Sequence, residues 1–526
     1  MHLIRSNRSG AMALPASMAS VNLARKAVLA AGLLFGVMAA QTAAAFDFND
    51  VAKAAQSLSA KSYKKPAENL PKDLKALNYD QYSDITYRPE KNVWRAEKLP
   101  FELSFAHEGA SYNLPVKISE IAGNSIRELK FSPDAFDYGN NKIDPEQLRN
   151  LGFAGVSVQY PINSNKTKDD IFSLLGASYF RALGKGQTYG ITARGLAVDT
   201  AMQSGEEFPR FVELWIVRPG AADKELTIYA LLDSSSLTGA YRFVLRPGVE
   251  TTIDVKAQLY LRNNVTKLGI APLTSMYFFG ENQRSDAEDV RPEVHDSDGL
   301  MVHSGSGEWI WRPLVDPRRL LVTSFGVRDP NGFGLMQRDR RFSSYEDLGA
   351  HYEARPSLWV TPKGKWGDGR VELVQIPTPN EDNDNIVAYW MPAKLPPLGK
   401  PFAIEYRLSW QKENDAKPAL AWVSQTRRGN GGPSGKPDDS IQLSVDFEGL
   451  ALKKLSNDSK LSAAIDTDDN GRLLETRVVR NDVTNGWRMV IRLRRNDENK
   501  PVELRGILRT GNTALSETWS YILPPN

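Results

Sequence analysis

Apolar and polar positions alternate along much of the chain, and this period of two is typical of half-buried β-strands. The clearest case runs from Ile253 to Leu261, where every second residue is apolar. Three later segments, 402–410, 441–447 and 487–493, show the same alternation. The pattern therefore predicts a mainly β protein.

Short sequences rich in Gly, Pro and Asn separate these segments and indicate turns. Arg-Pro-Gly follows a strand-like run at 218–220 and again at 246–248, and Asp-Asn-Gly at 469–471 has the composition of a hairpin turn. Helical spacing is sparse. It predicts helices only over 49–61 and 169–183.

A polar stretch at 411–418 interrupts the strand pattern and precedes about 110 residues with evenly spaced strands of their own. We place a domain boundary there. The first unit, 46–411, has the size of a large β-sandwich. The second unit, 412–526, has the size and strand spacing of a smaller immunoglobulin-like β-sandwich.

The N-terminal segment has the pattern of a secretory signal. Arg25 and Lys26 precede an apolar run over 27–40, and small residues at 43–45 provide a cleavage site. The run is too short for a comfortable bilayer crossing. The alternative, an uncleaved amphipathic anchor, would need a polar face that the run lacks. We therefore expect residues 1–45 to be removed and the mature protein not to span a membrane.

Composition narrows the possible functions. The chain has 526 residues, 41% hydrophobic and 25% charged, as in ordinary globular proteins. It has no cysteine, which excludes disulfides, thiolate metal sites and cysteine nucleophiles. Residues 1–45 hold four of the 66 basic residues and no acid, so the mature chain has 62 basic and 63 acidic residues. This balance gives no reason to expect nucleic acid as a partner. Export without cysteine fits the periplasm of a Gram-negative bacterium.

Motifs for metals and cofactors fail on inspection. The four histidines after residue 45 form no His-Glu-x-x-His pair. The sequence that starts at Asp466 begins like a calcium-binding loop, but Arg477 stands where the bidentate acid should be. No Gly-x-Ser-x-Gly sequence is present. We expect no metal and no cofactor.

Aromatic residues concentrate between positions 291 and 390, a fifth of the chain that holds five of the eleven tryptophans. Sugar rings stack their apolar faces on such aromatic side chains, while their hydroxyls bind carboxylates and arginines. Core packing in a large sandwich is the alternative explanation. The five tryptophans are Trp309, Trp311, Trp359, Trp366 and Trp390.

Two acidic clusters, 291–299 and 380–385, flank this region at the ends of strand-like segments. Hydrolysis of a glycosidic bond needs one carboxyl that is protonated and another that is ionised. The two clusters could each supply one of them. The alternative is that both are solvated turns whose acids cap main-chain amides.

Several long segments resemble one known family. They are 174–182, 189–195, 268–276, 291–300, 307–314 and 383–390. In these the chain resembles the periplasmic glucan biosynthesis proteins of the G and D type from Gram-negative bacteria. The resemblance covers essentially the whole chain after residue 45. The signal lacks a twin-arginine motif, which favours the G type.

The resemblance implies a large mutarotase-like β-sandwich followed by a small immunoglobulin-like domain, and a role in making osmoregulated periplasmic glucans with a β-1,2-linked backbone. Members of the family hydrolyse β-1,2-glucan with inversion. By the family pattern, Asp384 matches the general acid and Asp296 the general base, which can reach the attacking water through a relay of waters.

Two hypotheses follow. The first is a β-1,2-glucan hydrolase or transglycosylase that trims or remodels the glucan. The second is a non-catalytic glucan-binding scaffold that couples a membrane-bound synthase to periplasmic release. For either, we predict Trp309, Trp311 and Tyr345 as substrate contacts. Glu308 and Arg340 are candidate partners of sugar hydroxyls.

Overall fold

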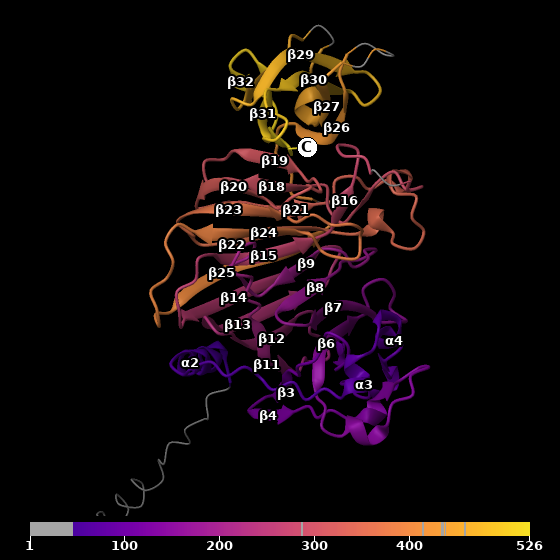
Figure 1. Cartoon of the computed structure of the whole chain (residues 1–526). Coiled ribbons are helices and arrows are strands. Elements are labelled where there is room, and N and C mark those ends of the chain that lie inside the picture. The colour runs from indigo at the N-terminus through magenta and orange to yellow at the C-terminus, as the bar shows by residue number, and fades with distance from the viewer. Residues whose placement is uncertain are drawn as a thin grey trace, which may run out of the picture. The chain divides into compact units, whose positions relative to one another are not determined.

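Two large β-sheets account for most of the chain, as the computed structural model shows (Figure 1). The structure describes residues 46–285, 288–412, 415–432, 436, 438–456 and 459–525. Residues 47–526 form one compact unit. The predicted signal at 1–45 lies outside the described residues. The expectation of a mainly β protein built from sandwiched sheets is confirmed.

The first large sheet has ten strands among the described residues, and the candidate site lies at the ends of two of its interior strands. Its strands lie in the order β2-β6-β7-β8-β9-β15-β24-β23-β20, with β10 paired to β15. They are β2 (Glu102–His107), β6 (Phe153–Tyr160), β7 (Asp169–Leu175), β8 (Tyr179–Ala182), β9 (Thr192–Arg194), β10 (Ala197–Val198), β15 (Leu268–Ser275), β20 (Leu321–Arg328), β23 (Asp368–Gln375) and β24 (Ile386–Pro392).

The second large sheet has fifteen strands in the described part of the chain, in the order β28-β31-β33-β19-β18-β21-β22-β25-β14-β13-β12-β11-β3-β4, with β32 paired to β31. They are β3 (Lys117–Ala122), β4 (Ser125–Glu128), β11 (Arg210–Val217), β12 (Leu226–Asp233), β13 (Leu237–Arg246), β14 (Thr251–Leu261), β18 (Gly299–His303), β19 (Trp309–Pro313), β21 (Gly332–Met336), β22 (Ser357–Lys363), β25 (Phe402–Gln411), β28 (Ser462–Thr467), β31 (Val502–Thr510), β32 (Thr513–Ala514) and β33 (Thr518–Leu523).

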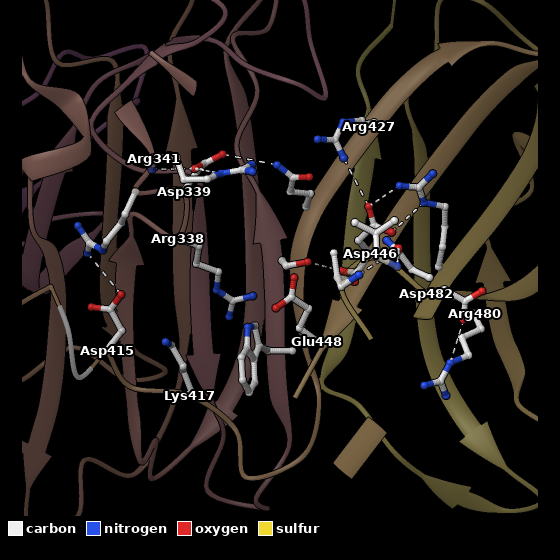
Figure 2. A pocket seen from close by; sticks show the side chains of 18 of the residues that line it. Arg338, Asp339, Arg341, Asp415, Lys417, Arg427, Asp446, Glu448, Arg480 and Asp482 are labelled. Carbon is white, nitrogen blue, oxygen red and sulfur yellow. Dashed lines mark hydrogen bonds and ion pairs between the residues drawn. The ribbon is translucent and has the colours of Figure 1, made fainter. Parts of the chain in front are cut away.

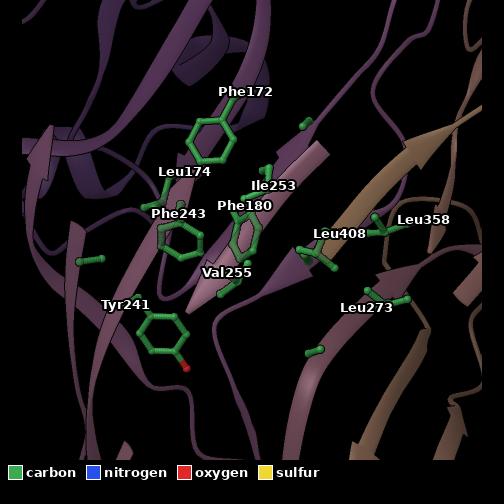
Figure 3. Packing of buried hydrophobic residues seen from close by; sticks show 14 of the residues in the cluster. Phe172, Leu174, Phe180, Tyr241, Phe243, Ile253, Val255, Leu273, Leu358 and Leu408 are labelled. Atoms are coloured by element: carbon green, nitrogen blue, oxygen red, sulfur yellow. The ribbon is translucent and has the colours of Figure 1, made fainter. Parts of the chain in front are cut away.

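The core between these two sheets consists of the inward-facing residues of their alternating strands. In β14 every second residue from Thr251 to Leu259 is buried, as the sequence pattern predicts. Figure 3 shows side chains of β7 and β8 packed against those of β13, β14 and β25. Each buried side chain of this size contributes about 1.5–3 kcal/mol relative to an exposed one. The labelled residues include Phe172, Leu174, Phe180, Tyr241, Phe243, Ile253, Val255 and Leu408.

A smaller four-stranded sheet lies near the C-terminus and packs over a second core (Figure 1). It consists of β26 (Trp422–Asn430), β27 (Ile441–Glu448), β30 (Gly486–Arg495) and β29 (Gly471–Asn481) in that order. Its core partners come from β31 and β33 and also from β18, β19, β21 and β22. The predicted boundary at 411/412 stays a prediction.

The helices are few and short in the described residues. The predicted helix over 49–61 is confirmed as α2 (Phe48–Ser59), which Asp47 caps and which packs on β13. The others are α3 (Lys72–Lys75), α4 (Tyr79–Ser83), α5 (Leu450–Lys453) and the 3₁₀ turns η1 (Pro89–Lys91), η2 (Pro133–Ala135), η3 (Pro145–Leu148), η4 (Phe342–Ser344) and η5 (Tyr352–Ala354). None of the helices in the described part of the chain has the length and apolar character that crossing a membrane requires.

Two local predictions were wrong. The segment 169–183 is not a helix but the antiparallel pair β7 and β8. The chain turns between them at Gly176 and Ala177, which have φ angles of +72° and +39° that no α-helix accommodates. The turn at 469–471 does not close a hairpin either, because β28 pairs with β31 while β29 pairs with β30 in the other sheet. The turns at 218–220 and 246–248 do connect paired strands, as predicted.

Candidate functional site

The two carboxylates predicted to carry chemistry stand at the ends of adjoining strands. Asp296 directly follows β17 (Val294–His295), which pairs with β16 (Tyr277–Phe279), and its main-chain N–H donates to the carbonyl of Met276 at 2.8 Å. Asp384 lies two residues before β24, beside the end of β15. Because β15 leads directly into β16, the fold brings the segments of both acids to the ends of two neighbouring interior strands, β15 and β24.

Asn385 joins the two acidic segments. Its Oδ1 accepts the main-chain N–H of Tyr277 at 2.8 Å, and its Nδ2 donates to the carbonyl of Tyr277 at 2.9 Å and to that of Ile376 at 3.0 Å. Asn385 is 3% exposed. Since Tyr277 is paired with His295, the residue before Asp296, these bonds fix the two carboxylate-bearing segments relative to each other.

The two carboxyls interact electrostatically. Asp384 is exposed at the surface, but protein atoms around its carboxyl partly displace water and the charge of Asp296 adds to this effect, so its pKa rises to about 6. The positive charges of Arg194, Arg181 and Arg355 oppose the rise. A carboxyl with this pKa can be protonated in weakly acidic or near-neutral solution, as a general acid must be.

Asp296 is buried, with 4% of its surface exposed, and it forms an ion pair with Arg355. Burial raises the pKa of Asp296, and the guanidinium of Arg355 lowers it. The main-chain carbonyl of Arg355 accepts a hydrogen bond from Nη1 of Arg340 at 2.7 Å, and Arg340 is in turn paired with Asp415 at 3.3 Å. Arg355 therefore favours the ionised form of Asp296, and Arg340 holds the main chain of Arg355.

A groove lies over β7, β8 and β9. A pocket of about 380 Å³ is lined by Tyr179, Arg181 and Thr192, and its end at Tyr112 is shared with a second pocket of about 250 Å³. The first volume is in the range of small-ligand sites. Tyr179, which lines this groove, has a raised pKa, chiefly because it is buried, and the charge of Asp384 adds to the rise.

Aromatic and arginine side chains alternate beside this groove. The guanidinium of Arg194 lies 4.6 Å from the ring centre of Tyr179, and that of Arg181 lies 4.3 Å from the ring centre of Tyr189. The hydroxyl of Tyr189 donates to Asp170 at 3.1 Å. Rings beside charged donors and acceptors are the groups that bind the faces and hydroxyls of sugars.

An ion-pair network fixes the loops around the acid pair. Arg291 binds Asp289 at 2.8 Å, Asp347 at 3.1 Å and Glu381 at 2.7 Å. These acids come from three separate segments of the chain. The charge of Glu381 also contributes to the raised pKa of Asp296. The network therefore connects the segments that carry Asp296 and Asp384 to a third loop, the one that carries Asp347.

The tryptophans predicted as substrate contacts lie elsewhere. Trp311 is 3% exposed in the second core, where the guanidinium of Arg338 lies 3.6 Å from its ring centre. Trp309 is half-buried and stacks on His303 at 3.9 Å and on Trp359 at 5.9 Å. Trp311 therefore fits the alternative explanation, packing in the core, because protein covers the faces of its ring.

The other predicted contacts divide between two places. Tyr345 is fully buried beside His295, with ring centres 5.2 Å apart, so it packs behind Asp296. Glu308 is paired with Arg505 and accepts the hydroxyl hydrogen of Thr518 at 2.7 Å, which ties β19 to β31 and β33. The structure therefore places Tyr345 near the acid pair and Glu308 in the contact with the C-terminal strands.

Arg340 lines a separate cleft of about 1170 Å³ (Figure 2). One wall follows β21 and carries Arg338, Asp339 and Arg341, and the opposite wall belongs to the four-stranded sheet and carries Arg427 and Asp446. Most of the charged groups are paired with each other, as Arg427 is with Asp446 at 3.4 Å. Arg340 thus supports Arg355 from this cleft.

Comparison with known proteins identifies the relatives of the chain. A family model described as "Periplasmic glucan biosynthesis protein, MdoG" matches residues 46–523. The chain belongs to this family. Among members of the periplasmic glucan biosynthesis family, "Glucans biosynthesis protein G" of Ralstonia nicotianae (strain ATCC BAA-1114 / GMI1000) is 59% identical over 502 residues, which are 94% of this chain and 99% of that relative.

The match confirms the resemblance found in the sequence, including its G type. As a member of the periplasmic glucan biosynthesis family, the protein takes part in the synthesis of periplasmic glucans. Its location is the periplasm, as predicted. These statements concern the family role.

Sequence reasoning missed several residues of the site, chiefly Arg355, Arg194, Arg181 and Tyr179. The last three lie in segments that carry the family resemblance, and a reading of 169–183 as strands would have placed Tyr179 and Arg181 on one face. Arg355 gave no such signal, because it is 59 residues from Asp296 and only the tertiary fold joins the two.

Proposed function

We propose that the protein is an inverting glycoside hydrolase that cleaves the backbone of β-1,2-glucan. The observation that supports this is the electrostatic coupling of Asp384 with Asp296, which helps raise the pKa of Asp384 to about 6. Two carboxyls with different environments, one buried and one exposed, are the groups that inverting cleavage requires.

In the proposed reaction, the protonated carboxyl of Asp384 donates its proton to the glycosidic oxygen as the bond from that oxygen to the anomeric carbon breaks. A water attacks the opposite face of the anomeric carbon and gives its proton to the carboxylate of Asp296, directly or through a relay of waters. The products are two shorter glucans, the new reducing end having inverted configuration. Asp384 ends ionised and Asp296 ends protonated, and solvent restores both.

The groove supports a polymeric substrate. Its two pockets share residues 111–112 and 176–177, so a chain bound at Asp384 can continue past Tyr179 toward Tyr112. Arg181 is exposed and lines this path, where it can donate hydrogen bonds to sugar hydroxyls. Several sugar units can therefore contribute binding energy to the positioning of the scissile bond.

The test compares Asp384→Asn with Asp382→Asn. Asp382 is an exposed acid of the same loop, hydrogen-bonded to Asn380 at 2.8 Å, and serves as the matched control. With linear β-1,2-glucan, we expect the Asp384 variant to lose at least about a hundredfold in the release of reducing ends, a typical contribution of a general acid, while glucan affinity and the activity of the control are retained. Wild-type cleavage by Asp384→Asn would exclude the proposal.

The same assay separates the two remaining hypotheses. Saturable glucan binding with no cleavage by the wild-type protein would favour the non-catalytic scaffold, with a membrane-bound synthase as its partner. Longer as well as shorter products would indicate transfer to a sugar hydroxyl, and so a transglycosylase. We favour hydrolysis because the carboxyl coupled to Asp384 can activate water.

A further inference from the structure

A buried cluster of ligand-type side chains lies directly behind Asp296. Glu293, His295 and Asp298 each present one ligand atom, and these three atoms lie within 4.8 Å of one another. Nε2 of His295 is 2.9 Å from Oε2 of Glu293 and 3.7 Å from Oδ1 of Asp298. His295 is 0% exposed and Glu293 is 6% exposed. The cluster takes no part in the steps of glucan cleavage described above.

The tautomer of His295 is fixed by its other neighbour. Nε2 of Gln337 donates to the main-chain carbonyls of His295 and Tyr352 at 3.1 and 3.3 Å, so the amide oxygen of Gln337 faces Nδ1 of His295 at 3.1 Å. Nδ1 must therefore carry a hydrogen. Nε2 is then the ring nitrogen that can bind a proton or a metal ion, and it faces the carboxylates of Glu293 and Asp298. A cation has to lie between these groups, either a proton or a metal ion.

The charge of the cluster favours more than a proton. Glu281 is a third acid close to it, because Glu281 and Asp298 line the same small cavity. The nearby guanidinium of Arg338 is already bound to the buried carboxylate of Glu517 at 2.7 Å. A proton on His295 offsets one of the two negative charges of Glu293 and Asp298, and a divalent cation offsets both. Uncompensated charge is costly in a buried site.

Room for a further ligand exists at the same place. A small cavity of about 10 Å³ is lined by Glu281, Asp298, Tyr277, Asn282 and their neighbours. This volume is about that of one enclosed water. We propose that Glu293, His295 and Asp298 bind one divalent transition-metal ion, with the fourth position taken by a water or by Glu281. One imidazole and two carboxylates suit Zn²⁺ best and Mn²⁺ next.

The ion would act on structure and not on the bond that is cleaved. It would join β17 to the segment that follows Asp296 and hold both against Gln337. Oδ2 of Asp298 accepts the main-chain N–H of Asp339 at 3.0 Å, so the ion would also connect β17 to the segment after β21. Asp296 stands between two of the proposed ligands, and its position would be fixed from both sides.

The test measures metal on the full mature chain. Protein dialysed against EDTA and then incubated with excess ZnCl₂ is freed of unbound metal by gel filtration, and its metal content is determined by mass spectrometry. We expect one Zn²⁺ per chain and a rise in Tm of about 2 °C or more on Zn²⁺ addition. Glu293→Gln and His295→Gln should lose both effects. MnCl₂ is the second probe.

His351→Gln is the matched control, because His351 is exposed beside Glu353 at 3.0 Å and could bind Zn²⁺ at the surface. Loss of binding in this variant with retention in Glu293→Gln would overturn the proposal. So would a wild-type chain that retains neither Zn²⁺ nor Mn²⁺, which would leave a proton as the cation at His295. If a variant fails to fold, the metal content of the wild-type chain still decides whether the cation at His295 is a metal ion or a proton. No glucan is used, so the result is independent of the proposed hydrolysis.

Discussion

Asn385 holds the main chain of Tyr277 with both ends of its amide, at 2.8 and 2.9 Å. Through this one side chain, the segment that carries Asp384 is joined to the ribbon that carries Asp296. Neither carboxyl needs to touch the other for their separation to be fixed. An inverting site depends on such a separation, about 6.5–9.5 Å between carboxyls or more with a relay of waters.

Asn385→Ala should impair turnover more than binding. Loss of the amide leaves the N–H of Tyr277 without its acceptor and frees the Asp384 segment, and a shift of about 1 Å can reduce kcat by about a hundredfold. We expect a fall in kcat of about tenfold to a hundredfold with KM changed less than threefold, measured on β-1,2-glucan. Asn380→Ala, in the same loop, should behave as the wild type. If KM rises by a similar factor while kcat is unchanged, Asn385 does not position the acid.

The rate should fall as the pH rises through about 6. The pKa of Asp384 is raised to about 6, so its carboxyl is protonated below that pH and ionised above it. Only the protonated form can donate to the leaving oxygen, so kcat/KM should decline on the alkaline side. A profile of kcat/KM from pH 4 to 9 checks this. A rate that stays level up to pH 8 would remove the proton of Asp384 from the rate-limiting step.

Arg355→Ala should shift both limbs of that profile toward higher pH. The charge of Arg355 lowers the pKa of Asp296 and also that of Asp384, so its removal raises both. The base then needs a higher pH to ionise, and the acid keeps its proton to a higher pH. Arg355→Lys retains the charge and should restore the limbs in part. An unshifted profile with reduced rate would indicate that Arg355 acts on folding only.

Trp311→Ala should act on stability. The ring is 3% exposed in the second core and lies against Arg338, so its loss leaves a cavity and should lower the free energy of unfolding by about 3–5 kcal/mol. Denaturant unfolding measures this change, and glucan affinity of the folded fraction should be unaltered. A stable variant with weakened glucan binding would restore Trp311 as a substrate contact.

The general architecture could be predicted because alternation of apolar residues follows directly from burial of one sheet face. The strand from Thr251 to Leu261 shows this in full. The prediction of a helix over 169–183 was wrong because strand pairing, which the local sequence does not show, sets the structure of this segment. Ile171 and Leu174 are three residues apart, which is a helical spacing, but both are buried on opposite faces of β7, whose pairing with β6 makes the segment a strand. Without that pairing, Tyr179 and Arg181 could not be placed in the groove.

The candidate acids could be predicted and their partners could not. Asp296 and Asp384 stand in polar clusters next to strand-like segments, which the sequence displays. Composition could not distinguish a sugar platform from a core, because tryptophan serves both. Four of the five tryptophans in the aromatic region are buried, namely Trp311, Trp359, Trp366 and Trp390. The aromatic residue whose pKa the charge of Asp384 affects is a tyrosine, Tyr179 of β8.

The configuration of the first product tests the central claim most directly. Linear β-1,2-glucan cleaved by the wild-type protein can be followed by proton NMR before mutarotation equilibrates the new reducing ends. The account predicts that α-anomers form first and that Asp384→Asn forms none. First products with β configuration would contradict an inverting acid pair, and the absence of any cleavage would contradict a hydrolase.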